Sequence, residues 1–199
     1  MAITNYTGLQ AAVANWMNRG DLAAVVPDFI ALAESRIATD LRVRRLIATL
    51  TMNTVAGQSL ALPAGWLEFK SLRWNGRPLD FLTPEQAAGQ FSQAFTGEPR
   101  YYTLEADRLV FGPAPDGVYP IVASYYKQLD PLATTDTNWL LTSKPNLYLY
   151  AALAEGSLFV KKPDDAASWA GLYGGIIDAM HTEDKTSMHS GSTMAVRAR

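Results

Sequence analysis

The sequence predicts an α+β protein in which helices from the two ends of the chain form one bundle and an antiparallel β region is inserted between them. Apolar residues repeat with helical spacing over residues 7–41, with a spacing near two over residues 44–128, and with helical spacing again over residues 145–181. Residues 182–199 are polar and serine-rich without a repeat, which is typical of a flexible tail. We therefore expect a single domain over residues 1–181 and a C-terminal tail over residues 182–199.

Two helices are expected in the first part of the chain. The first runs from Thr7 to Met17, with Thr4 or Thr7 as its cap and a single apolar stripe. The second runs from Pro27 to Leu41, or begins at Leu22 if Pro27 lies in its first turn, a position that suits proline. Because the connection between them is short, the two helices are expected to pack as a hairpin.

The β region is expected to contain short strands separated by turns. The sequence Asn75-Gly76 predicts a tight hairpin, because both central residues of that turn need a positive φ. A short helix is expected from Pro84 to Phe91, with Thr83 as its cap and Gln86 reaching back to it. The expected strands are residues 45–53, 60–62, 68–74, 77–82, 101–104, 108–111 and 118–128.

Two further helices are expected before the tail. The first runs from Pro145 to about Val160 with Ser143 as its cap, and its apolar residues lie nearly all round it, which predicts burial on every side. The second begins near Pro163. It contains Gly174-Gly175, at a cost of roughly 1 kcal/mol per glycine, so we expect something to pack closely against its backbone there.

The composition excludes several classes of function. Charged residues make up 18% of the chain and the net charge is −2, which excludes a strongly basic protein that coats DNA. The chain has no cysteine and two histidines, so thiol chemistry is excluded and imidazole chemistry is poorly supplied. The N-terminus lacks a signal-peptide pattern and no apolar run is long enough to span a bilayer, so we expect no association with a membrane.

No motif predicts a catalytic, metal or cofactor site. Asp164 and Asp165 are interpreted as favourable charges at a helix start rather than as a catalytic pair. His181 and His189 lie near or in the tail, where nothing fixes them as metal ligands. The sequence has no Gly-x-Ser-x-Gly motif, and its glycines lack the context of a phosphate-binding loop. We therefore predict that the protein is not an enzyme and has no cofactor.

Basic and aromatic residues form two other groups. The basic group comprises Arg36, Arg42, Arg44 and Arg45. We interpret it as cations that neutralise a helix C-terminus, with Glu34 and Asp40 as partners, in preference to a phosphate-binding site. The adjacent tyrosines at 101–102 and 125–126 favour a protein interface over base stacking, because neighbours in a strand face opposite sides.

Several stretches together resemble a known family. They are residues 26–37 (VPDFIALAESRI), 62–68 (LPAGWLE) with 74–76 (WNG), 108–115 (RLVFGPAP) and 147–156 (LYLYAALAEG). In their order and spacing over residues 22–180 they resemble the head–tail adaptor, or head-completion, proteins of tailed bacteriophages. The resemblance carries no catalytic motif.

The resemblance implies a structural virion protein at the head–tail junction. Such a protein is made in the host cytoplasm and forms a ring, usually of twelve copies, beneath the portal protein. It then contacts a downstream tail or nozzle protein. Genomic DNA passes through the ring without sequence-specific binding, which agrees with the near-neutral charge of the chain.

Two groups of residues are predicted interfaces. In the tail, Met188, Met194 and Val196 are spaced to enter pockets of the portal as an extended strand, and Arg197 and Arg199 to meet acidic groups. The alternative is a solvated terminus without a role.

The second group lies on excursions from the helical bundle, which often carry contacts. By the resemblance, we assign Asn75 and Gly76 of the hairpin, and Phe91 and Phe95 around the loop at residues 92–99, to subunit or tail-side contacts.

Two rival functions remain open at this stage. The first is an accessory binding module with a ligand site lined by Trp66, Trp74 and Tyr101. The second is an enzyme that uses carboxylates alone, such as a glycosidase. It is disfavoured because no Asp or Glu stands out on an apolar strand or helix face.

Overall fold

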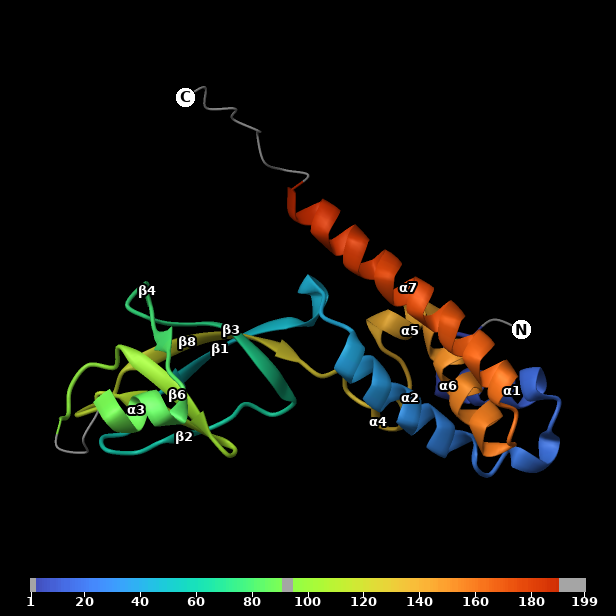
Figure 1. Cartoon of the computed structure of the whole chain (residues 1–199), viewed down its shortest axis with the longest axis horizontal. Helices are drawn as coiled ribbons and strands as arrows, with labels where there is room; N and C mark the ends of the chain where they lie inside the picture. Colours follow the sequence, from blue (N-terminus) through green and yellow to red (C-terminus); the bar gives the residue numbers. More distant parts are fainter. Residues whose placement is uncertain (1–2, 91–94, 190–199) are drawn as a thin grey trace, which may run out of the picture. The chain divides into compact units, whose positions relative to one another are not determined.

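The computed structural model describes residues 3–90 and 95–189, which form an α+β protein as predicted (Figure 1). The chain divides into two compact units. The helical unit contains the residues up to Arg44 and those from Leu129 onward, and the β unit contains Arg45–Gln128.

The helical unit begins with two helices joined by a short connection. Helix α1 (Tyr6–Met17) is capped by Asn5, whose Oδ1 accepts a hydrogen bond from the Gly8 N–H at 2.9 Å. The predicted cap at Thr4 or Thr7 is therefore wrong, because Asn5 has the extended backbone that a cap requires and Thr7 lies inside the helix. The 3₁₀ helix η1 (Gly20–Leu22) leads to α2 (Val26–Asp40), which has proline in its first turn as predicted.

Two short helices after the β unit were not predicted. They are α4 (Leu132–Thr135) and α5 (Trp139–Ser143), and Asn138 caps α5 by accepting bonds from the N–H groups of Leu140 and Leu141. Ser143 therefore ends α5 instead of capping α6 (Pro145–Phe159), and its hydroxyl donates to the Trp139 carbonyl at 2.8 Å. The capping prediction for Ser143 is wrong because that side chain is already used inside the preceding helix.

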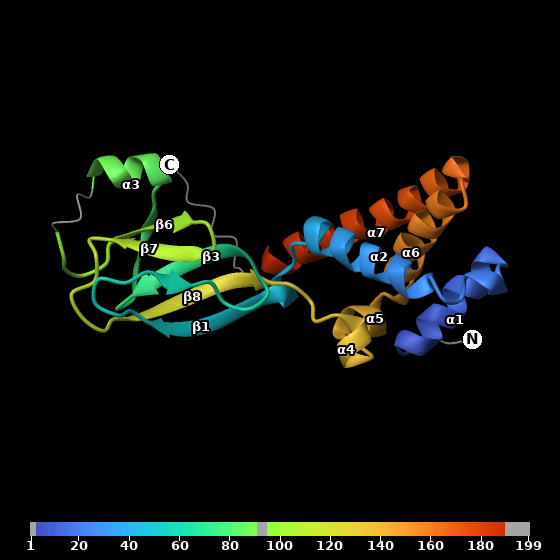
Figure 2. The ribbon, with the colours of Figure 1, turned by 90° about the horizontal axis from the view of Figure 1, so that it is seen from below.

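Helix α6 is the centre of the helical unit. It contacts α1, α2, α5 and α7 (Pro163–His189), and Figure 2 shows it flanked by α2 and α7. The prediction that α6 is buried on every side is confirmed for most of its length. Its buried residues are Leu147, Tyr148, Leu149, Ala151, Ala152, Leu153, Ala154, Gly156 and Ser157.

Helix α7 differs from the prediction in two ways. It continues to His189, so residues 182–189, predicted as the start of the tail, are helical. No close approach is found at Gly174-Gly175 among the residues that the structure describes, since a Cβ at either position would meet none of their atoms within 4 Å. The close approach is at Gly156 of α6, where a Cβ would lie 2.7 Å from Met17 Sδ and 3.2 Å from Phe29 Cδ2.

The β unit contains two four-stranded sheets. The first has the order β1-β8-β3-β4 and comprises β1 (Ile47–Asn53), β8 (Pro120–Lys127), β3 (Trp66–Trp74) and β4 (Arg77–Pro78). The second has the order β2-β7-β6-β5 and comprises β2 (Leu60–Ala61), β7 (Arg108–Gly112), β6 (Tyr101–Glu105) and β5 (Asp80–Phe81). All pairs are antiparallel except β5–β6, which is parallel.

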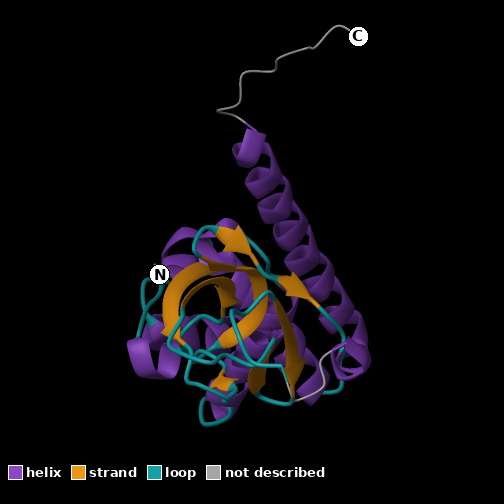
Figure 3. Cartoon of the chain, turned by 90° about the vertical axis from the view of Figure 1, so that its left-hand side faces the viewer, coloured by secondary structure: helices purple, strands orange, loops and turns teal. Residues whose placement is uncertain are grey.

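The strands curve around an apolar core (Figure 3). Its buried residues are Leu72, Leu79, Leu109, Phe111, Ile121, Ala123 and Tyr125. The first strand begins at Ile47 because Arg44–Leu46 form the short 3₁₀ helix η2, so the predicted start at residue 45 was too early.

Two local predictions in the β unit are confirmed. Asn75 and Gly76 have φ values of 48° and 76°, as the hairpin turn between β3 and β4 requires. At α3 (Pro84–Gln90), the Thr83 N–H donates to Gln86 Oε1 and the Gln86 N–H donates to Thr83 Oγ1, which forms the predicted capping box.

The single strand predicted for residues 77–82 is wrong. It divides at Leu79 into β4, in the first sheet, and β5, in the second. Leu79 is 7% exposed in the core, and its N–H donates to the Leu72 carbonyl at 2.9 Å, whereas the Asp80 N–H donates to the Arg100 carbonyl. The chain changes sheets here because Leu79 turns into the space between them.

Candidate interaction surfaces

The shifted titratable groups inside the helical unit belong to structural hydrogen bonds. Burial raises the pKa of Tyr148 to about 12, and its hydroxyl accepts a bond from Asn138. Burial, followed by a bond donated to Asp40, raises the pKa of Tyr173. Burial also raises the pKa of Glu34, which accepts from the Leu132 N–H at 2.8 Å. Each group thus joins two segments of the helical unit.

The described residues give no metal cluster and no membrane span. Over residues 3–90 and 95–189, no three His, Cys, Asp or Glu side chains are grouped so that they could hold a metal ion. Within the same residues, no helix has both the length and the apolar character needed to cross a bilayer.

The predicted hairpin residues lie on the surface. Asn75 and Gly76 are both exposed at the tip of the β3–β4 hairpin. The positive φ values of the turn define the backbone conformation of the tip. This exposure makes the hairpin available for contacts.

Phe95 is exposed on an anchored backbone. Its side chain is 67% exposed, yet its carbonyl accepts from the Ala114 N–H at 3.2 Å and the Gly97 N–H donates to the Ala114 carbonyl at 2.8 Å. An aromatic ring held in solvent by a fixed backbone is typical of an interface. Phe91, predicted with it, lies outside the described residues.

Two pockets of the β unit are lined by tyrosine. The larger, of about 650 Å³, lies against Phe95, Tyr101, Tyr102 and Phe111. The smaller, of about 320 Å³, is lined by Trp74 and Tyr101 together with charged residues. Trp66, predicted as a third member of one ligand site, lines neither of these two pockets and packs on Phe69 at 5.3 Å.

An aromatic patch on the helical unit was not predicted. Its aromatic members are Trp16 of α1, Tyr150 of α6 and Trp169 of α7. The Trp16 and Trp169 rings lie 5.7 Å apart edge to face, and Tyr150 stacks on Trp169 at 5.7 Å. Trp16 is 55% exposed, and Leu172, one turn beyond Trp169, is 50% exposed. We call these four residues the aromatic patch.

The exposed face of α7 continues beside this patch. Ala167, Gly171, Gly175 and Ala179 follow one another at four-residue spacing and are all exposed. Between Ala166 and Ala179, Asp178 is the only charged residue of the sequence. The sequence predicts a close approach at Gly174-Gly175 alone, and the four-residue spacing of these small residues is the signal that this prediction missed.

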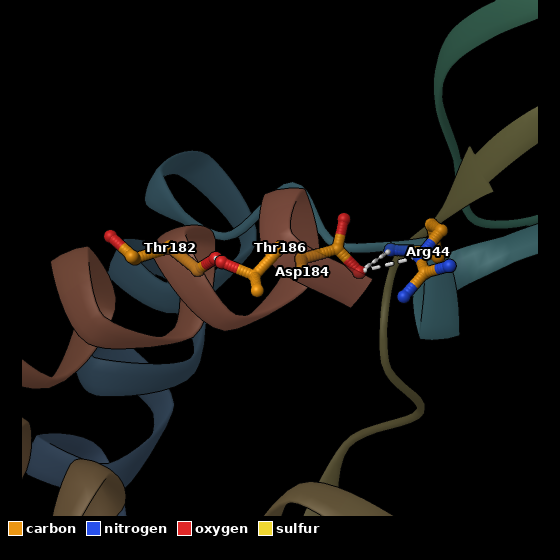
Figure 4. Close-up of polar contacts among 4 residues, drawn as sticks. All are labelled: Arg44, Thr182, Asp184 and Thr186. Atoms are coloured by element: carbon orange, nitrogen blue, oxygen red, sulfur yellow. Dashed lines mark hydrogen bonds and ion pairs between the residues drawn. The ribbon is translucent and has the colours of Figure 1, made fainter. Parts of the chain in front are cut away.

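The end of α7 is held by polar contacts to the segment that follows α2 (Figure 4). Asp184 Oδ1 accepts from the Arg44 N–H at 3.2 Å and from Arg44 Nε at 2.9 Å. His181 Nε2 accepts from the Arg42 N–H at 3.3 Å. We call His181, Asp184, Arg42 and Arg44 the α7 clasp.

Two threonines in the same end of α7 bond to the helix backbone. The hydroxyls of Thr182 and Thr186 donate to the carbonyls four residues earlier, at Asp178 and Thr182, each at 2.9 Å. Such bonds do not strengthen a helix, so the clasp is what explains why the helix continues where the sequence has no apolar repeat.

The predicted role of the arginines at the end of α2 is partly confirmed. Arg42 Nη1 donates to the Ala38 and Leu41 carbonyls at 2.6 and 2.9 Å, as expected for a cation at a helix C-terminus. Arg36 pairs with Glu155 at 3.2 Å. The predicted acidic partners, Glu34 and Asp40, accept from Leu132 N–H and the Tyr173 hydroxyl.

Most of the residues predicted to contact the portal lie beyond the end of α7 in the sequence. Met188 lies on the last turn of α7, and nothing is described of its side chain. Met194, Val196, Arg197 and Arg199 lie outside the described residues.

One comparison with known proteins gives a match. The model of a family described as SU10 adaptor protein matches residues 4–197. No curated protein matches the chain.

Proposed function

Since the chain belongs to the SU10 adaptor family, a phage head–tail adaptor family, we propose that it forms a ring beneath the portal and links the portal to the tail around a DNA channel. The family assignment carries this proposal, because the match extends over residues 4–197. It confirms the resemblance inferred from the sequence. The protein is thus a structural adaptor and a virion component of a bacteriophage.

The aromatic patch is the proposed contact between neighbouring copies in the ring. Tryptophan and tyrosine are enriched at the centre of protein interfaces, and Trp16 is 55% exposed beside the exposed Leu172. The neighbouring face of α7 has small side chains and little charge, so a helix of another copy can approach closely. Gly174 and Gly175 also have open space at their Cβ positions, which leaves room for an outside partner.

The residues after α7 are the proposed contact with the portal. The α7 clasp holds the helix at His181 and Asp184, shortly before the residues proposed to bind the portal. Met194 and Val196 are proposed to enter portal pockets, and Arg197 and Arg199 to meet acidic groups. Met188, in the last turn of α7, is proposed to contribute to the same contact.

Contacts with the next tail component are proposed for the β unit. The tip at Asn75 and Gly76 and the exposed ring of Phe95 are the candidates, with Phe91 assigned by sequence. Genomic DNA is proposed to pass through the ring without sequence-specific binding, since a net charge of −2 gives little attraction for phosphate.

Mass photometry of the purified chain, the portal and their mixture tests the ring. We expect the portal mass to rise by the mass of about twelve chains, one for each subunit of a twelvefold ring. Removal of residues 190–199, which leaves all of α7, is expected to abolish this increase. Full binding by the shortened chain would contradict the assignment of the portal contact, and no increase with the intact chain would contradict the ring.

The contact between copies is tested by Trp16→Glu combined with Leu172→Glu. We expect the variant to occupy only some of the portal subunits and to bind them without cooperativity. Single copies can still bind the portal, but neighbouring copies no longer pack against one another. The matched control, Val118→Glu, changes an exposed residue of the β unit, where Val118 is 70% exposed. Ring formation by the double variant equal to that of the control would contradict the patch.

The tail-side contact is tested by Phe95→Ser against Val118→Ser. Both residues are highly exposed, at 67% and 70%. We expect both chains to fold and to bind the portal, and only the Phe95 variant to lose addition of the next tail component. Normal tail addition by that variant would contradict the proposal.

The proposed absence of catalysis has its own test. A screen for hydrolase and nuclease activity with the folded chain is expected to be negative. Activity that is lost on a single carboxylate substitution would contradict it.

A further inference from the structure

Strand β1 is an unusually open sheet edge. Among the strands that the structure describes, the other three sheet edges, β2, β4 and β5, are each two residues long, and β4 contains Pro78. Strand β1 is seven residues long and pairs with β8 without a register shift. Its sequence, Ile-Ala-Thr-Leu-Thr-Met-Asn, contains neither a charge nor a proline.

Among the described residues, strand β1 lacks four of the features that usually protect a sheet edge: charge, proline, a bulge and short length. An edge strand presents unpaired N–H and C=O groups, and folded proteins shield these groups with charges, proline, bulges or short length. The middle of β1 is exposed at Thr49, Leu50 and Thr51. Ala48 and Met52 pack against the core of the β unit, whereas Leu50 between them is 42% exposed. The edge therefore leaves both backbone groups and an apolar side chain available.

The sequence of β1 is complementary to itself in one antiparallel register. When two copies pair about Leu50, that residue faces its equivalent and each Thr49 faces Thr51 of the second copy. Ala48 then faces Met52 of the second copy. Threonine pairs and apolar pairs across strands are favourable, and no like charges meet in this register.

We propose that β1 is a self-association edge through which two free copies of the chain pair antiparallel. The pairing joins the two four-stranded sheets that contain β1 into one continuous sheet and covers Leu50 with its equivalent. Such a contact uses the same surface on both copies and closes at a dimer, whereas a ring needs two different surfaces. The β1 contact is therefore separate from the aromatic patch and belongs to the protein before it joins the portal.

Single cysteines test the register directly, because the chain has none of its own. We expect Leu50→Cys to form a disulfide-linked dimer rapidly under mild oxidation, since its partner is directly opposite. Thr49→Cys mixed with Thr51→Cys is expected to give cross-linked dimers containing one copy of each. Val118→Cys, at an exposed residue outside β1, is the control for random collision. Cross-linking of the Leu50 variant no faster than the control would overturn the proposal.

Sedimentation velocity of the cysteine-free chain provides the second test. We expect a reversible dimer and a loss of about tenfold or more in its affinity with Leu50→Lys, because two ammonium groups would then face each other. Val118→Lys is expected to dimerise normally, and circular dichroism checks that both variants fold. A wild-type chain that stays monomeric would overturn the proposal. If it stays monomeric while Leu50→Lys impairs binding to the portal or tail protein, the occupant of the edge is a strand of that partner, and the proposal is equally overturned.

Discussion

The helical unit and the β unit bury their apolar side chains to different extents. Of the twelve largest fully buried side chains among the described residues, nine belong to the helical unit and three, Leu72, Leu109 and Ile121, to the β unit. In the β unit, partly buried aromatic side chains pack against the core. They are Trp66, Phe69, Trp74, Tyr102 and Tyr119.

This difference indicates that the side chains of the two cores are not equally free to rearrange. An enclosed core such as that around α6 resists rearrangement, because close-packed side chains have few alternative positions. Rings that remain partly exposed can shift and can contact other molecules. The side chains packed around α6 therefore have less freedom to rearrange than the partly exposed rings that border the β core, although both units carry proposed contact surfaces.

The largest expected effect comes from matched cavities in the two cores. Leu153→Ala and Leu109→Ala each remove a side chain that is at most 1% exposed. We expect each to lower the free energy of unfolding by about 2–5 kcal/mol, with the larger loss at Leu153 because its enclosed neighbours cannot move into the space. Urea unfolding measures both, and Leu158→Ala, at a residue 54% exposed, is the control. Equal losses, or a larger loss at Leu109, would remove the distinction between the cores.

Two glycines on adjacent helices should respond with opposite signs. Gly156→Val would place side-chain atoms onto Met17 and Phe29 and is expected to lower the free energy of unfolding by about 1–3 kcal/mol. Gly175→Ala has open space and is expected to raise it by about 0.5–1 kcal/mol through the higher helix propensity of alanine. Thermal unfolding of the free chain measures both. Destabilisation by the alanine would show that the α7 face is packed within the chain.

The hairpin turn tests a local feature of the β unit. Gly76 has a φ of 76°, and a Cβ there would meet no atom within 4 Å, so only backbone strain opposes a side chain. We expect Gly76→Ala to lower the stability of the β unit by about 1 kcal/mol. Gly89→Ala, which has open space and no positive φ, is the matched control and should not destabilise. Chemical denaturation followed by tryptophan fluorescence would show whether the two variants differ.

The α7 clasp should contribute a smaller amount. Asp184→Asn weakens two charge-assisted bonds to Arg44, whose side chain is 40% exposed, so we expect a loss of less than about 1 kcal/mol. Hydrogen exchange should show faster opening of residues 181–187 at the end of α7. Glu183→Gln changes a neighbouring pair that is more exposed and should leave exchange unchanged. Equal exchange in the two variants would count against the clasp.

The smallest expected effect is a pH dependence in the helical unit. Burial raises the pKa of Glu34 above its ordinary value, so its carboxyl stabilises the fold most while protonated. That contribution is present below the pKa of the unfolded chain and is lost as the pH rises through the raised pKa of the folded chain.

Glu34→Gln cannot ionise, so its stability relative to the parent should increase across this pH interval and then remain constant. Urea midpoints measured between about pH 4 and pH 8 test this. The exposed Glu85→Gln provides the control. If the stability of the variant relative to the parent decreased with rising pH, the pKa of Glu34 would be lowered rather than raised by folding.

Features that depend on neighbouring residues were predicted well. The positive φ values at Asn75 and Gly76, the capping box at Thr83 and Gln86, and the burial of α6 follow from residues within one turn or one helix. Among the candidate sites, exposure of the hairpin tip and of Phe95 agrees with their predicted positions outside the core. Their contacts stay predictions.

One missed feature is local: Asn138 rather than Ser143 is the residue that caps a helix, and it begins α5. Other missed features depend on distant residues, since Leu79 divides a predicted strand because the space between two sheets accepts it. The aromatic patch brings together residues of α1, α6 and α7, so no single stretch of sequence displays it.

By itself the sequence determined the α+β class, the types of most elements and the resemblance to phage adaptors, because apolar periodicity and turn chemistry are local properties. Tertiary structure alone decided that α7 continues to His189, since Asp184 and His181 bond residues about 140 positions earlier. It likewise decided that β1 is an open edge, because whether a strand has a neighbour depends on the order of strands in the sheet rather than on the strand itself.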